Sequence, residues 1–324
     1  MIEFENRAST VLYNALRSLR TTGPFLLPAN ICPIIPLVFL KAGRAFEFID
    51  IDPESLCIDQ HAVMARWRVP ADPPAGIVYV RTYGAIFDAT ELFAGIKATD
   101  SAALIIDDRC LAMPDCRESL AAFVDIALYS TGYAKSADLG FGGFGVMRDG
   151  VRYERADLPY HRGDLEVITA QYKDALTTGK QFIYRDCNWL DTCAPTLRWS
   201  QYRQVVETTT EQALALKSTI NDHYAKHLPV DVQFPDPFQT WRFNVRVRNK
   251  AEILKAIHRG GLFASGHYDS LTNIFGCGNA PVAAQLHAQV INLFNDHYFD
   301  IDRADRIVNL LQGLDVMAPD QVLS

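Results

Sequence analysis

One lysine, Lys135, lies in surroundings that suit covalent chemistry. It follows an apolar run at 126–129 and precedes a glycine-rich stretch at 140–143. Upstream, another short apolar run ends in two adjacent carboxylates, Asp107 and Asp108. An amine on a loop after one strand and a carboxylate at the end of another are the two groups needed to bind pyridoxal phosphate (PLP). The amine forms an aldimine, and the acid keeps the pyridine nitrogen protonated so that the ring can accept electrons.

Lys135 also has a simpler interpretation, because a lone lysine on a loop is usually an exposed surface residue. A free lysine is protonated at neutral pH and is a poor nucleophile, whereas a buried site lowers its pKa. The nearby acid and the glycines favour the Schiff base. The acidic pair has an alternative too, since strand-end carboxylates can cap a helix or pair with Arg109.

Several motifs in the same order resemble the DegT/DnrJ/StrS family of PLP-dependent aminotransferases, many of which act on nucleotide-linked ketosugars. They are the acidic pair 107–108, Ser130, Lys135 five residues later, and the Gly-x-Gly-Gly run at 140–143. Weaker similarity extends from about residue 7 to residue 312, so that it covers nearly the whole chain. The strict Gly-x-Gly-x-x-Gly of a dinucleotide site is absent.

The order of apolar segments predicts an α/β fold. Short apolar runs alternate with helical patterns over the first 150 residues, which indicates a sheet flanked by helices, with ligand groups at the carboxyl ends of its strands. The resemblance implies fold type I of the PLP-dependent transferases, with a mostly parallel sheet. We expect a large PLP-binding domain at 1–228 and a smaller α+β domain at 229–324. Residues 150–187 show little periodicity and are expected to cover the active site or to contact another subunit.

The resemblance implies roles for the residues around the cofactor. Asp108 meets the ring nitrogen, because adjacent side chains of a strand point to opposite faces and the family uses the second acid. Ser130 contacts the phosphate. Ser9 and Thr10, where the family places its first-helix phosphate contacts, either do the same or are ordinary N-caps of a helix. Cys32 stands where an aromatic residue often stacks on the ring.

Asn188 resembles the asparagine that reaches the PLP phosphate of the neighbouring subunit. This implies a homodimer with a shared active site. Four further residues are weaker candidates for substrate contacts, each with a structural alternative such as an ion pair or a core position: Tyr83, Arg81, Arg242 and His267. Arg81 can bind an anionic group bidentately.

The chain departs from the family pattern at four positions. Leu111 replaces a Gln or His near the ring hydroxyl, Leu190 replaces an Arg, Phe141 replaces a Glu, and Cys32 replaces the stacking aromatic. The expected function is transfer of an amino group from an amino-acid donor, glutamate by family analogy, to a ketone acceptor. The default acceptor is a nucleotide-linked ketosugar for polysaccharide or natural-product biosynthesis. The departures leave two alternatives open, another PLP-dependent reaction such as elimination or decarboxylation, and a degenerate non-catalytic binding or regulatory protein.

The composition excludes several other classes. Of 324 residues, 49% are apolar and 21% are charged, which is typical of a globular protein. The net charge of −7 and the lack of a long basic run argue against nucleic-acid binding. The N-terminus does not resemble a signal peptide, and the most apolar stretch, at 25–40, is interrupted by prolines and is too short to span a membrane. Seven cysteines without a Cys-x-x-Cys pair indicate reduced thiols in the cytoplasm and no metal site.

Overall fold

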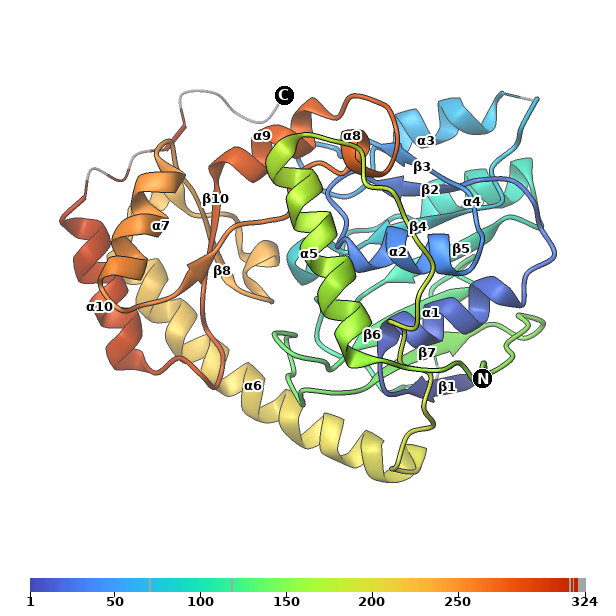
Figure 1. Cartoon of the computed structure of the whole chain (residues 1–324). Coiled ribbons are helices and arrows are strands. Elements are labelled where there is room, and N and C mark those ends of the chain that lie inside the picture. The colour runs from blue at the N-terminus through green and yellow to red at the C-terminus, as the bar shows by residue number, and fades with distance from the viewer. Residues whose placement is uncertain (70, 118, 315, 317, 320–324) are drawn as a thin grey trace.

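The chain folds around two β-sheets, as a computed structural model of residues 1–69, 71–117, 119–314, 316 and 318–319 shows (Figure 1). The strands are β1 (Ile2–Glu5), β2 (Phe25–Pro28), β3 (Phe46–Ile49), β4 (Gly76–Val80), β5 (Leu104–Asp108), β6 (Ile126–Ser130), β7 (Gly143–Met147), β8 (Phe243–Arg246), β9 (Ala264–Ser265) and β10 (Val290–Leu293). The α-helices are α1 (Ala8–Arg17), α2 (Ile34–Lys41), α3 (Gln60–Trp67), α4 (Thr90–Thr99), α5 (Arg162–Thr178), α6 (Trp199–His227), α7 (Lys250–Arg259), α8 (Thr272–Phe275), α9 (Pro281–Gln289) and α10 (Ile301–Gln312).

The first sheet has seven strands in the order β1-β7-β6-β5-β4-β2-β3. Strands β6, β5, β4, β2 and β3 run parallel to one another. At the other end of the sheet, β7 is antiparallel to β6 and β1 is antiparallel to β7. The expected mostly parallel sheet is therefore confirmed. The parallel strands β4, β5 and β6 end at one edge, and the ends of these strands and the segments that follow them carry Arg81, Asp108 and Lys135 to that edge.

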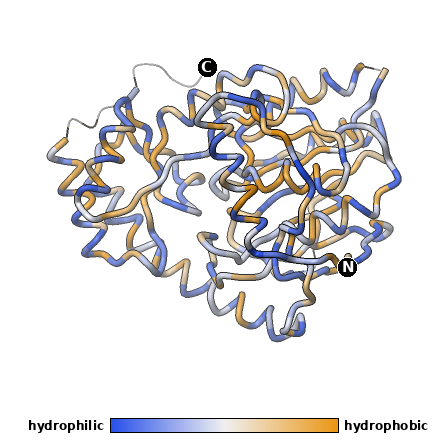
Figure 2. The backbone as a smooth tube through the Cα atoms, viewed as in Figure 1, coloured by the Kyte–Doolittle hydropathy of each residue, from blue (hydrophilic) through white to orange (hydrophobic). Residues whose placement is uncertain are grey.

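Alternate side chains of these strands supply two hydrophobic layers. Leu27, Val78 and Ile106 pack under α1, α2 and α5 on one face. Ile77 and Ile105 pack under α3, α4 and the start of α6 on the other. Figure 2 shows the hydrophobic colouring concentrated along these strands. Helices cover both faces of the sheet, as in other parallel sheets. Polar functional side chains can therefore gather only at the strand ends.

The second sheet has three antiparallel strands in the order β8-β10-β9. It packs with α7, α10 and the second half of α6, where Ile220 and Tyr224 join its hydrophobic core. In Figure 1, α6 runs along the lower edge of the molecule and connects the two sheets. The domain boundary expected at residue 229 stays a prediction, because α6, which precedes it, contributes to this second core.

Helix α5 and strand β10 are among the elements that the sequence does not predict. Helix α5 lies inside the segment 150–187, whose sequence shows little periodicity, and it crosses in front of the first sheet (Figure 1). Its buried residues are Ile168, Tyr172 and Ala175, so that its apolar stripe is narrow. Strand β10 follows directly on α9, without a connecting loop.

Candidate active site

The two carboxylates at the end of β5 have different partners. Asp107 is fully buried, and its oxygens lie 2.7 Å from Arg81 Nε and 2.7 Å from Arg109 Nη2. Arg81 is itself 3% exposed and also donates a hydrogen bond to the carbonyl of Phe87. These contacts occupy both Asp107 and Arg81 in a buried ion pair. The charge of Arg81 is therefore compensated inside the protein. This agrees with a role in an ion pair, the alternative to a substrate contact.

Asp108 points to the other side of the strand and has no such partner. It is 5% exposed, and its Oδ1 accepts a hydrogen bond of 2.9 Å from the Cys110 N–H. Among the described residues, no basic group lies within ion-pair distance of it. Burial raises the pKa of Asp108, while the Cys110 hydrogen bonds and the nearby Lys135 ammonium act in the opposite direction. A buried carboxylate in this state favours a cationic ligand.

Lys135 lies on a tight turn after β6. The preceding residue, Ala134, has φ 60°, a left-handed conformation that is unfavourable for a side chain with a Cβ. Asp138 stabilises this turn, because its Oδ2 accepts from Ala134 N at 2.6 Å and its Oδ1 accepts from Gly140 N at 2.7 Å. The Trp241 indole donates to the Ala134 carbonyl at 2.7 Å. The backbone on both sides of Lys135 is thus fixed by polar contacts.

Replacing Asp138 with alanine is expected to loosen this turn and to lower the free energy of unfolding by about 1–2 kcal/mol, because two backbone N–H groups lose their acceptor. Urea unfolding of the variant measures the effect. Asp149→Ala, at an exposed turn position, is the matched control and is expected to unfold like the wild type. Equal unfolding midpoints for all three proteins would contradict this role of Asp138.

A phosphate site can form at the start of α1. Helix N-termini offer unpaired N–H groups to anions, and among the described residues no side chain caps this one. Ser130 Oγ, on a residue that is 6% exposed, accepts from Gly132 N at 3.3 Å. The Arg7 guanidinium donates to the Gly140 carbonyl at 3.2 Å, so that it contacts the loop that follows Ser130. Arg7 is not a candidate that the sequence pattern predicts.

The N-cap alternative for Ser9 and Thr10 is wrong. The N-cap is Arg7, and both residues lie inside α1. The Thr10 hydroxyl donates to the Asp191 carbonyl at 2.6 Å, so that it holds a later segment against the helix. Ser9 is half-buried in the first turn, where its hydroxyl stays a phosphate candidate.

Polarisable side chains lie near Asp108. Cys32, from the loop after β2, interacts with the Tyr268 hydroxyl, and this contact together with burial raises the pKa of Tyr268 well above its ordinary value. Asp108, next to Lys135, also contributes to that shift. Burial and the adjacent Asp108 raise the pKa of the Cys110 thiol. Tyr268 nevertheless exposes 39% of its surface to solvent.

Tyr83 and His267 lie together between the two sheets. Tyr83 is fully buried and stacks on Trp241 with ring centroids 6.3 Å apart, and its edge contact with His267 has centroids 4.9 Å apart. Burial, with His287 and Lys250 nearby, lowers the pKa of His267 to about 3, so that its ring is neutral.

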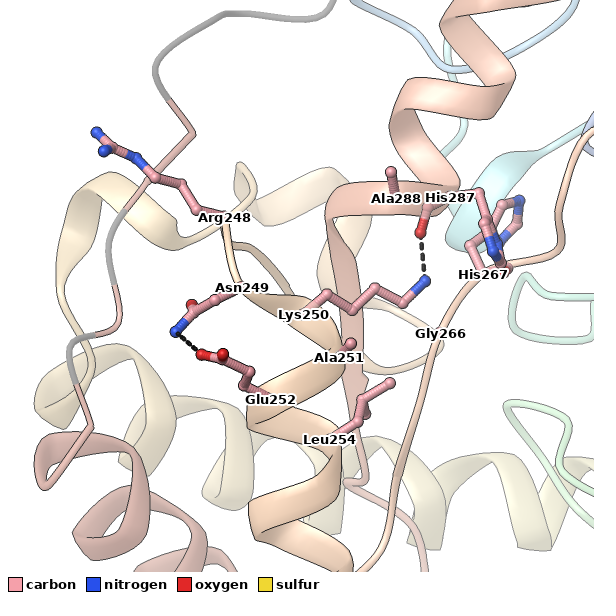
Figure 3. A pocket seen from close by; sticks show the side chains of 10 residues that line it. All are labelled: Arg248, Asn249, Lys250, Ala251, Glu252, Leu254, Gly266, His267, His287 and Ala288. Carbon is pink, nitrogen blue, oxygen red and sulfur yellow. Dashed lines mark hydrogen bonds between the residues drawn. The ribbon is translucent and has the colours of Figure 1, made fainter.

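His267 also borders a pocket of about 730 Å³ at the start of α7 (Figure 3). There the Lys250 ammonium donates to the carbonyl of His287, and Asn249 donates to Glu252.

Asn188 lies on the loop that follows α5. Its backbone N–H donates to Asp164 Oδ2 at 2.8 Å, and its carbonyl accepts from His161 N at 2.7 Å. The same loop reaches the start of α1 through Asp191, whose carbonyl accepts from the Thr10 hydroxyl. Asn188 is thus placed by contacts to its own chain, and its expected role across a subunit interface stays a prediction.

Proteins of known structure share this fold. A DegT/DnrJ/EryC1/StrS aminotransferase from Brucella abortus is similar with a TM-score of 0.65 at 16% identity, over 96% of this chain and 85% of that one. The sugar aminotransferase CalS13 from Micromonospora echinospora gives 0.67 at 17% identity, over 96% and 87%. The fold is fold type I of the PLP-dependent aminotransferases. This expectation from the sequence is therefore confirmed.

The same fold also carries other chemistry. The GDP-4-keto-6-deoxy-D-mannose-3-dehydratase of E. coli, solved with bound hydrated PLP, is similar with a TM-score of 0.62 at 12% identity, over 96% of this chain and 87% of that one. Comparison with protein-family models and with curated protein sequences finds no match. Within the described residues, no helix is long and apolar enough to cross a membrane, and no group of three His, Cys, Asp or Glu side chains can hold a metal ion.

Proposed function

We propose that this protein is a PLP-dependent aminotransferase that acts on a ketosugar. The observation that carries the proposal is the position of Asp108 and Lys135 at neighbouring strand ends, close enough that the Lys135 charge opposes the rise that burial causes in the pKa of Asp108. These two groups are the ones that PLP requires, and the fold is one in which this cofactor is used.

The side chains present suit the cofactor. The buried Asp108 carboxylate has no cationic partner among the described residues and is suited to a protonated ring nitrogen. The start of α1, Ser130 and Arg7 can bind a phosphate group. Cys32 and Tyr268 interact with each other near Asp108, at the ring end of the proposed site. When bound, PLP supplies an electron sink for the bonds at the substrate carbon.

The chain itself supplies position and proton transfer. Lys135 Nζ would hold the cofactor and, as a free amine, would carry a proton to and from the substrate carbon. The turn fixed by Asp138 and Trp241 directs this amine, which limits the geometries that it can adopt. The enclosed Asp107–Arg81 pair keeps the adjacent strand ends rigid.

The proposal also names the amino donor, the ketone acceptor and the oligomeric state. An amino acid, by family analogy glutamate, is the proposed donor, and a nucleotide-linked ketosugar is the proposed acceptor, as the sugar aminotransferase CalS13 supports by its fold. We propose a homodimer in which Asn188 approaches the partner's cofactor. The seven unpaired cysteines support the proposed cytoplasmic location.

Adding glutamate to the PLP-loaded protein tests the reaction class. The visible absorption of the bound cofactor is expected to fall, and 2-oxoglutarate is expected to restore it, because the two halves of a transamination are reversible. Recovery of the absorption without any keto acid would instead indicate elimination or decarboxylation, an alternative that the related fold of the E. coli dehydratase supports. An unchanged spectrum with every amino acid tried would support a non-catalytic binding protein.

A further inference from the structure

A second cavity, of about 340 Å³, lies beside Lys135 and between the two sheets. Its walls come from three places in the fold. The loop after β6 supplies Lys135 and Asp138, α6 supplies Lys217, and the segment after β10 supplies Asn295 and Asp296. The cavity therefore joins the reactive amine to residues that none of the sequence motifs singled out.

Lys217 is the unusual member of this cavity. It is 4% exposed, and its Nζ donates to the Trp241 carbonyl and to Asn295 Oδ1, both at 2.8 Å. Both acceptors are neutral, and no carboxylate lies within ion-pair distance of Nζ among the described residues. An ammonium carries three N–H donors, so one is left for a ligand. Burial, and then the adjacent Arg242, lower the pKa of Lys217 to about 7.

Arg242 adds a second buried cation. It is fully buried, its Nη1 lies 2.7 Å from Asp296 Oδ2, and its guanidinium lies 3.9 Å from the centroid of the Phe294 ring. Its Nε and Nη2 have no hydrogen-bond partner among the described residues. Asp296 faces both the cavity and this guanidinium, so that one carboxylate compensates two neighbouring buried cations. A buried N–H donor without a hydrogen-bond partner destabilises the folded protein, unless a ligand accepts its hydrogen bond.

The charges around the cavity leave an excess of one. The buried cations are Lys217 and Arg242, and the buried anion beside them is Asp296. A buried excess positive charge favours an anionic ligand. A carboxylate carries the matching single negative charge, whereas a phosphate dianion would over-compensate it. Ala213 and Leu216 line the same cavity and offer an apolar wall to a short methylene chain.

We propose that this cavity binds a carboxylate group with Lys217 as its anchoring cation, and that in the proposed transamination this group is a carboxylate of the amino donor. The second part rests on the proposed function, since it uses the position of Lys135 in the cavity wall. Lys217 is thereby a specificity-determining residue for acidic amino acids.

Binding of glutarate to the PLP-loaded protein, measured by isothermal titration calorimetry, tests the proposal. Glutarate has two carboxylates and no amino group, so that it binds without reacting. Lys217→Met is expected to weaken it roughly tenfold to a hundredfold, the usual effect of losing one charge-assisted hydrogen bond. Lys226→Met, at an exposed position of the same helix, is the matched control and is expected to bind as the wild type does.

The pH dependence gives a second readout that does not need the methionine variant to fold. Below about pH 7 Lys217 is protonated and the glutarate affinity is at its maximum. As the pH rises above this value, free Lys217 loses its proton and the affinity falls. Lys217→Arg remains charged and is expected to bind without this decline. His297, which also lines the cavity, is unchanged in that variant, so the comparison isolates residue 217.

Three results would overturn the proposal: wild-type protein that does not bind glutarate, equal affinity in Lys217→Met, or the same pH decline in Lys217→Arg as in the wild type. Failure of the proposed function looks different. Glutarate bound through Lys217, in a protein that forms no borohydride-stable PLP adduct at Lys135, would support the carboxylate site and contradict the aminotransferase.

Discussion

Replacing Asp108 with asparagine is expected to lower the transamination rate by roughly two to four orders of magnitude without lowering stability. The amide cannot keep a ring nitrogen charged, which is the role assigned to this carboxylate. Stability is spared because burial raises the folded-state pKa of Asp108 above its ordinary value. A carboxyl whose pKa is higher in the folded than in the unfolded protein destabilises the fold as the pH rises above its unfolded pKa, so that the neutral amide removes a cost.

Asp107→Asn is the matched control, one residue away. Its carboxylate is paired with Arg81 and Arg109, and removing one charge from a buried ion pair costs about 3–5 kcal/mol. We therefore expect a large loss in urea stability and a nearly normal turnover per molecule of folded, PLP-loaded protein. Steady-state kinetics and urea unfolding of both variants check the pair. The opposite pattern, with catalysis lost at 107 and spared at 108, would reverse the assignment of the two carboxylates.

Lys135→Ala is expected to reduce transamination by at least roughly a thousandfold, because the side chain supplies both the covalent link and the proton transfer. The fold is expected to persist, since Lys135 is only half-buried and forms no ion pair among the described residues. The measurements are single-turnover kinetics with glutamate and the visible spectrum of the protein mixed with PLP.

A small amine provides the control for Lys135→Ala. Added methylamine is expected to restore part of the rate, as it can replace a missing amine but not a lost fold. Lys226→Ala, at an exposed position of α6, is expected to behave like the wild type. Full activity of Lys135→Ala without any added amine would contradict the role of this residue.

The strands and their ends could be predicted because their signals are local. The run before Asp107 is apolar, and adjacent carboxylates must face opposite sides of a strand, so that the sequence predicts different surroundings for Asp107 and Asp108. The choice of Asp108 for the ring nitrogen comes from the family resemblance. The role of Arg81 could not be predicted in the same way. Its partner follows 26 positions later on the neighbouring strand, and only the register of β4 against β5 brings the two together.

The start of α1 shows how tertiary contacts override a local rule. Ser9 and Thr10 are good N-cap residues, but β1 pairs with β7 and determines where the chain turns into the helix. The helix therefore begins at Ala8, and Thr10 contacts the Asp191 carbonyl. The cavity at Lys217 has no sequence signal at all, since its polar groups come from three segments that only the packing of the two sheets brings together.

Lys135 is the residue on which the proposed chemistry depends, because no other group in the site is assigned the covalent link to PLP. Reduction of the PLP-incubated protein with borohydride, followed by peptide mapping, identifies the lysine that holds the cofactor. We expect a single phosphopyridoxyl adduct, on the peptide that contains Lys135. An adduct on another lysine, or protein that takes up no PLP, would contradict the assignment.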